Sequence, residues 1–179
     1  MTHDEPGFLD DGTIDDTLPD IVQEFLESGA DLEEIRLDAR GEWTHEGLDF
    51  ENQKIIDLFN RSVDRTDGGT WVLEVGRFTY PITVEDTGFF VEQVDLETSP
   101  PLLRLSDGTT ETLDPDTLEY ESGGRLYCRV KNGEFRARFK RPAYYDLADR
   151  CERQDGGIYL ELDDRRVRLA SVDQLDESG

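Results

Sequence analysis

The chain has 179 residues, of which 43 are acidic and 19 are basic, and its formal net charge at pH 7 is −24. A charge this negative makes general binding to nucleic acids or to anionic membranes unfavourable. No apolar stretch is long enough for a transmembrane helix, and two cysteines do not make a disulfide framework, so we expect a cytoplasmic protein.

The N-terminal residues predict a tail followed by a helix. Residues 1–16 are polar, acidic and aperiodic, so we expect a disordered acidic tail, and they lack the basic and apolar regions of a signal peptide. Residues 17–31 are predicted as an N-terminal helix. Thr17 can cap this helix, Pro19 is typical of a first turn, and Gly29 marks the end.

Residues 32–87 predict the first half of a duplicated unit. The expected elements are, in order, strands over 34–38 and 42–45, a helix over 51–63 capped by Asp49, and a hairpin over 71–84. Residues 88–124 predict central strands over 89–96, 102–105 and 110–113. Pro100-Pro101 and Asp107-Gly108 separate these strands.

Residues 125–172 predict the second half of the unit. The expected elements are a hairpin over 125–140 that turns at Asn132-Gly133, a helix from Arg141 to about Arg153, and a last hairpin over 158–170. Residues 173–179 are expected to form a frayed tail.

Two stretches of the chain repeat each other. Gly41-Glu42-Trp43 matches Gly133-Glu134-Phe135, and Asp67-Gly68-Gly69 matches Asp155-Gly156-Gly157, within an ordered series of matches. Chance agreement between common strand patterns is the alternative. We therefore predict an α+β fold with two similar strand-strand-helix-hairpin halves around a mainly antiparallel sheet, preceded by the N-terminal helix.

Several further motifs add a family resemblance to this prediction. They are Gly41-Glu42-Trp43, Val84-Glu85-Asp86-Thr87 followed by Phe89-Phe90-Val91, Tyr127-Cys128-Arg129-Val130, and Ala137-Arg138-Phe139 with Arg141, Ala143-Tyr144-Tyr145 and Leu147. On these motifs, residues 35–170 resemble the bacterial family catalogued as domain of unknown function 1285. The resemblance implies a duplicated α+β fold with no assigned activity, and a regulatory, signalling or ligand-sensing role.

The hairpin at Asn132-Gly133 carries the clearest candidate binding face. A two-residue loop fixes the register, so that Arg129 faces Arg136 and Tyr127 faces Arg138. Alternation then puts the apolar residues on the core face and the other side chains on one outward face. We call this second set the basic hairpin face, and its predicted anion-binding residues are Arg125, Tyr127, Arg129, Lys131, Arg136, Arg138 and Lys140.

Two explanations of this charge remain open at the level of the sequence. The protein's own carboxylates can neutralise the bases, or the face can bind an anionic small molecule or an acidic protein partner. Arginine side chains suit phosphate and carboxylate groups, and Tyr127 could stack on a nucleobase. The oligomeric state is left open.

Catalytic chemistry has little support in the sequence. No zinc spacing, calcium loop, phosphate loop or dinucleotide fingerprint is present, so we predict no cofactor, no metal and no catalytic residue. Cys128 and Cys151 lie on apolar faces and are expected to be buried.

The function expected is that of a small ligand-binding or regulatory protein. The alternatives are a metal-assisted phosphate-ester hydrolase that uses Glu85 and Asp86, and a protein–protein adaptor.

The composition also indicates a salt-adapted host. Acids greatly outnumber bases, and arginine replaces lysine at most basic positions. Such a surface repels itself in dilute buffer and remains soluble in concentrated salt. We therefore expect a halophilic protein. The alternative is an acidic protein from a GC-rich genome, whose codons favour arginine.

Overall fold

The computed structural model describes residues 5–162 and 165–172, which form two compact units. The division falls between Gly88 and Phe89, and each unit is described separately. The predicted C-terminal tail, residues 173–179, lies outside the described residues. The fold is α+β, with three α-helices and mainly antiparallel sheets in the described part of the chain.

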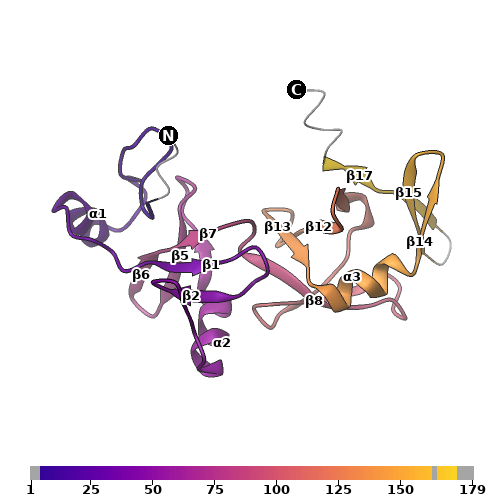
Figure 1. The fold of residues 1–179 in the computed structure, drawn as a ribbon, viewed down its shortest axis with the longest axis horizontal. Helices are drawn as coiled ribbons and strands as arrows, with labels where there is room; N and C mark the ends of the chain where they lie inside the picture. The colour runs from indigo at the N-terminus through magenta and orange to yellow at the C-terminus, as the bar shows by residue number, and fades with distance from the viewer. Residues whose placement is uncertain (1–4, 163–164, 173–179) are drawn as a thin grey trace. The chain divides into compact units, whose positions relative to one another are not determined.

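The first unit contains two helices and two small sheets (Figure 1). Its elements are α1 (Asp20–Glu27), β1 (Ile35–Leu37), β2 (Trp43–His45), β3 (Leu48–Asp49), α2 (Gln53–Ser62), β4 (Val63–Arg65), β5 (Trp71–Val75), β6 (Phe78–Pro81) and β7 (Thr83–Val84). One sheet has the strand order β3-β2-β1-β7 and the other the order β4-β5-β6. All of these pairs are antiparallel except β1 with β7.

Residues 5–16 differ from the predicted disordered tail. Phe8 and Ile14 form a β-bridge, and Asp15 is fully buried. Phe8 and Ile14 also pack on the apolar cluster of Leu18, Leu26 and Val72. The prediction was wrong for this segment because its few apolar side chains find partners in α1 and β5, which are distant in sequence. Residues 1–4 lie outside the described residues.

The two helices of the first unit are shorter than predicted. α1 occupies only the middle of the predicted range 17–31, and Gly29 follows it with a positive φ of 77°. α2 is capped by Asn52, whose side chain accepts a hydrogen bond from the Lys54 amide at 3.0 Å, rather than by Asp49. Asp49 instead belongs to β3.

The second unit is built on a seven-stranded sheet. Its elements are β8 (Phe89–Asp95), β9 (Leu102–Leu105), β10 (Thr110–Thr112), the 3-10 helix η1 (Pro115–Thr117), β11 (Glu119–Glu121), β12 (Arg125–Val130), β13 (Phe135–Phe139), α3 (Arg141–Ala148), β14 (Cys151–Gln154), β15 (Gly157–Leu162), β16 (Arg165–Arg168) and β17 (Ala170–Ser171). The large sheet has the order β10-β9-β8-β13-β12-β11-β17, and a smaller antiparallel sheet has the order β14-β15-β16.

The β12–β13 hairpin lies in the middle of the large sheet and has the predicted register. Tyr127 pairs with Arg138 and Arg129 pairs with Arg136. The predicted core face is buried as expected; its members are Leu126, Cys128, Val130, Phe135, Ala137 and Phe139. α3 lies along β8 (Figure 1) and contributes the fully buried Ala143 and Leu147.

The segment after α3 is a strand, although the sequence predicted helix to Arg153. α3 ends at Ala148, and Cys151–Gln154 forms β14, which pairs with β15. Asp155 and Gly156, both with positive φ, make the two-residue turn between these strands. An Asp-Gly pair favours this hairpin turn, and strand pairing there overrides the helical pattern.

The two units share an order of elements. The first has the pair β1–β2, then α2, the sheet β4-β5-β6 and the short strand β7. The second has the pair β12–β13, then α3, the sheet β14-β15-β16 and the short strand β17. They differ in that β7 pairs directly with β1, whereas β11 lies between β17 and β12.

Candidate functional site

Four cations of the basic hairpin face form ion pairs with carboxylates of the same unit. The pairs are Arg125 with Glu121 at 3.0 Å, Lys131 with Asp107 at 2.6 Å, Arg136 with Glu119 at 3.6 Å, and Lys140 with Glu92 at 3.8 Å. The acids come from neighbouring strands and turns rather than from a covering helix. For these four residues, the protein's own carboxylates therefore supply the neutralising charge.

Tyr127 lies inside the structure, although the sequence placed it on the outward face. The residue is 2% exposed, and the Arg136 guanidinium lies over its ring at 3.5 Å from the centroid. A cation over an aromatic face is stabilising, and the long arginine stem also shields the ring from water. This arrangement leaves no open ring face of Tyr127 on the Arg136 side for a nucleobase. Arg138 pairs in the sheet with Tyr127 and with Phe90.

Lys131 and Arg129 line a hollow of about 510 Å³ at the tip of the hairpin. Glu111 and Asp114 line the same hollow, so two acids balance the two bases. Lys131 Nζ donates to Asp107 at 2.6 Å and to Thr109 at 2.9 Å. The Thr109 hydroxyl and amide also donate to Asp107. Burial raises the pKa of Asp107, but the hydrogen bonds from Lys131 and Thr109 outweigh burial and hold its pKa below the ordinary value. The hollow therefore has no excess of positive charge among its described residues.

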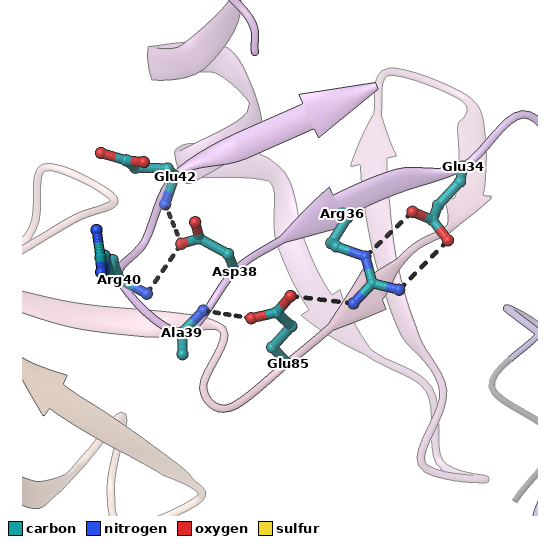
Figure 2. A network of polar contacts seen from close by, with 7 residues as sticks. All are labelled: Glu34, Arg36, Asp38, Ala39, Arg40, Glu42 and Glu85. Carbon is teal, nitrogen blue, oxygen red and sulfur yellow. Dashed lines mark hydrogen bonds and ion pairs between the residues drawn. The ribbon is translucent and has the colours of Figure 1, made fainter. Parts of the chain in front are cut away.

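Glu85, one of the two carboxylates considered for hydrolysis, connects β7 to β1. Figure 2 shows that one of its oxygens accepts from Arg36 at 3.1 Å and the other accepts from the Ala39 amide at 3.0 Å. Arg36 also donates to Glu34 at 3.1 Å. These contacts hold the start of the β1–β2 turn against the end of β7. Within residues 5–162 and 165–172, no three His, Cys, Asp or Glu side chains lie together in an arrangement that could hold a metal ion.

A separate cavity of about 500 Å³ lies in the second unit. Its walls come from the β11–β12 turn, α3, β14, β15 and the region around β17; the lining residues are Tyr120, Glu121, Ser122, Gly123, Gly124, Arg125, Leu126, Tyr144, Ala148, Cys151, Arg153, Gly156, Ile158, Leu169 and Ser171. We call it the Arg125–Arg153 cavity. Its volume is in the range of small-molecule sites.

Glycines shape one side of this cavity. Gly123 and Gly124 form the β11–β12 turn with φ values of 100° and 83°, a conformation that other residues rarely adopt. A Cβ on Gly124 would lie 3.5 Å from the Tyr144 hydroxyl, so the turn and α3 approach closely. Arg125 follows the turn and faces Glu121 across it. The turn thereby places one arginine at the cavity wall.

The described lining residues carry two positive charges and one negative charge. Arg125 is paired with Glu121, whereas no carboxylate of the described residues lies within ion-pair distance of the exposed Arg153. Cys151 also lines the cavity, and burial raises the pKa of its thiol to about 11, so it is uncharged at neutral pH. The cavity therefore combines a small positive charge with aromatic and aliphatic walls.

The sequence identified only one charged residue of this cavity. Arg125 belongs to the predicted basic hairpin face, but Arg153 was assigned to the end of a helix. Tyr144, which entered the sequence analysis only through the family motif, is half-buried at the cavity wall. The Gly123-Gly124 pair before a strand was the available signal, because such a pair indicates a close approach of the backbone to another group.

The architecture defines a class of small α+β protein with mainly antiparallel sheets. Two solved structures share this fold. A DUF1285 family protein from Silicibacter pomeroyi DSS-3 aligns with a TM-score of 0.58 over 80% of this chain and 83% of that chain. A DUF1285 family protein from Shewanella baltica OS155 aligns with a TM-score of 0.52 over 67% of this chain and 94% of that chain.

Sequence identity to each of these two proteins is 18%. The predicted resemblance to DUF1285 proteins is thus confirmed for the fold. No protein-family model matches the chain, and a search of curated proteins finds no match. Within the described residues, none of the helices has the length and apolar character needed to cross a membrane.

Proposed function

We propose that this protein binds a small anionic molecule in the Arg125–Arg153 cavity. The observation that carries the proposal is an excess of arginine in a cavity of about 500 Å³, within a chain whose net charge is −24. A chain this acidic repels anions over most of its surface. A local positive charge in a partly apolar recess is therefore the place where an anion is stabilised best.

The two arginines have different roles in the proposal. Arg153 receives the anion directly, because its guanidinium presents several donors that match carboxylate or phosphate oxygens. Arg125 adds a second positive charge, which Glu121 partly balances and holds in place at 3.0 Å. This assignment keeps Arg125 of the predicted set and moves the binding position away from Arg129, Arg136 and Arg138.

A binding role is favoured over hydrolysis by the contacts of Glu85. Both of its oxygens accept hydrogen bonds from Arg36 and Ala39, and a general base or metal ligand needs such an oxygen for its substrate. The ion pairs of the basic hairpin face similarly favour a small-molecule ligand over an acidic protein partner, because the four carboxylates already occupy those cations.

We also infer that the chain is a divergent DUF1285 protein that arose by internal duplication and acts in the cytoplasm. The shared order of strand pair, helix, three-stranded sheet and short strand in the two units supports the duplication. Fold likeness to two DUF1285 proteins supports the family. The proposed role is regulatory: binding of the anion would change how the protein interacts with other molecules.

Isothermal titration calorimetry and thermal shift with the full chain test the proposed site. The probes are nucleotides, sugar phosphates and organic carboxylates, each with the same counter-ion and at matched salt. We expect at least one anion to bind and to raise the melting temperature. Arg153→Gln should weaken its binding by about tenfold, equivalent to about 1.4 kcal/mol.

Arg104 supplies the matched control, because it is an exposed arginine on β9 of the same unit and does not line the cavity. Arg104→Gln changes the net charge equally and should leave anion affinity unchanged. Equal losses in the two variants would show that binding depends on overall charge and would refute the site. Failure of every anion to bind would refute the function.

A further inference from the structure

The walls of the Arg125–Arg153 cavity indicate which kind of anion it takes, an inference that rests on the proposed function. Leu126 and Leu169 are almost fully buried beside the cavity, with 4% and 5% exposure. Ala148 and Ile158, both partly buried, add further aliphatic surface. The exposed parts of Ala148 and Ile158 favour the apolar body of a ligand, because binding would remove this surface from water.

Two tyrosines make part of the wall suitable for a flat group. Tyr144 and Tyr120 are both half-buried and line the cavity. The Tyr144 ring is held against Tyr145 in an edge-to-face arrangement, with centroids 5.5 Å apart. A tyrosine ring offers an apolar face for stacking, and its few rotatable bonds keep the cost in side-chain freedom low. The aliphatic wall and the tyrosines together favour a planar body over a sugar.

The charge of the cavity limits the ligand to few negative charges. Arg125 forms an ion pair with Glu121. The charged lining residues are Arg125, Arg153 and Glu121, so the described lining carries a net charge of only +1. A group with a single negative charge balances this excess. A phosphate monoester carries close to two negative charges above neutral pH, and its second charge would be repelled by Glu121 and by the acidic surface.

We propose that the cavity takes a monoanionic carboxylate with a flat, apolar body, rather than a nucleotide or a sugar phosphate. The carboxylate lies at Arg153 and Arg125, and the body lies against Ala148, Ile158 and Tyr144. Planar carboxylates suit arginine because two of its N–H groups can donate in parallel to the two oxygens. Recognition then depends on both ends of the ligand.

Titration calorimetry with three probes that share a benzyl group tests this inference. Phenylacetate is a monoanion, benzyl phosphate approaches a dianion at slightly alkaline pH, and benzyl alcohol is neutral. We expect phenylacetate to bind at least about tenfold more tightly than each of the others. Arg153→Gln should remove that preference over benzyl alcohol, and Arg104→Gln should retain it.

A second variant tests the position of the body. Ala148→Phe puts a large side chain into the cavity from the last turn of α3 and should abolish phenylacetate binding. Because this variant could also disturb packing, its unfolding transition is compared with that of the unmodified chain. Arg153→Gln, at an exposed position, keeps the test valid if Ala148→Phe does not fold.

The possible failures are distinguishable. If benzyl phosphate binds as tightly as phenylacetate, or if benzyl alcohol does, the inferred ligand class is wrong. A phosphorylated ligand whose binding is lost in Arg153→Gln would keep the proposed function and overturn only this inference. If no anion binds in the broad screen, the proposed function and the inference both fail.

Discussion

The guanidinium of Arg136 lies 3.5 Å from the centre of the Tyr127 ring, at the middle of the seven-stranded sheet. The guanidinium covers one face of this tyrosine, which is 2% exposed although basic residues flank it in the sequence. Glu119, at 3.6 Å from Arg136, holds the guanidinium from the neighbouring strand. The charged residues of the hairpin therefore contribute to the packing of the sheet.

Removal of the Arg136 guanidinium should destabilise the second unit. Arg136→Gln loses both the contact with Tyr127 and the ion pair with Glu119, so we expect a loss of about 1–2 kcal/mol in the free energy of unfolding. Urea denaturation measures this loss. Arg104→Gln, which removes an exposed arginine from the same sheet, should change the free energy of unfolding little. Equal effects of the two substitutions would contradict a specific role for the stacking contact.

Asp15 should give the first unit a defined sensitivity to acid. Burial raises the pKa of this carboxyl, but hydrogen bonds from Thr17, Thr66 and Thr70 outweigh burial and lower the pKa from 3.8 to about 2. A lowered pKa in the folded state means that the ionised carboxylate stabilises the fold above pH 4. That stabilisation, about 2 kcal/mol, is lost as the pH falls toward 2.

The variant Asp15→Asn isolates this contribution from those of the other acids. Its deficit in the free energy of unfolding should be largest above pH 4 and should shrink as the pH falls from 4 to 2. Denaturant titrations at a series of pH values measure the difference between the two proteins. A deficit that stays constant across this range would contradict the role of the ionised carboxylate.

Gly68 and Asp15 should show strong coupling in a double-mutant cycle. A Cβ on Gly68 would lie 2.2 Å from Asp15 Oδ1, and its three nearest neighbours are all atoms of the Asp15 side chain. Gly68→Ala should therefore destabilise the unmodified chain. In an Asp15→Ala background the same substitution should cost much less, because the crowded side chain is gone. Additive losses would show that Gly68→Ala acts through some other contact.

The acidic surface should make stability depend on salt. We expect the melting temperature to rise from dilute buffer to molar potassium chloride, because salt screens the repulsion among 43 acids. The outcome that contradicts salt adaptation is an equal melting temperature at low and molar salt. A comparison of potassium chloride with sucrose distinguishes screening from general stabilisation by solutes.

The regular parts of the fold could be predicted because local patterns determine them. Asn132-Gly133 fixed the register of β12 and β13, and alternation then gave the buried face correctly. The family resemblance, which rested on short motifs, was also confirmed for the fold. These predictions needed only neighbours within a few residues of each other.

The failures involved contacts between distant residues. The burial of Asp15 depends on Thr66, 51 residues away, so an acidic leader looked disordered from its composition alone. The strand at Cys151–Gln154 forms because β15 pairs with it, although its local pattern is helical. Arg153 was missed as a site residue for the same reason, because that pairing places it at the cavity wall.

The attachment of Asp15 to Thr66 has a practical consequence for protein preparation. A shortened version starting at Thr17, where the sequence suggests the first helix, would discard the carboxylate that joins the leader to the β4–β5 turn. It would also remove Phe8 and Ile14, which pack against Leu18 and Leu26. The apolar side chains of this cluster would then be exposed to water, and such exposed apolar surface promotes aggregation. Removal of residues 1–16 would therefore yield a protein that is less stable and more prone to aggregation.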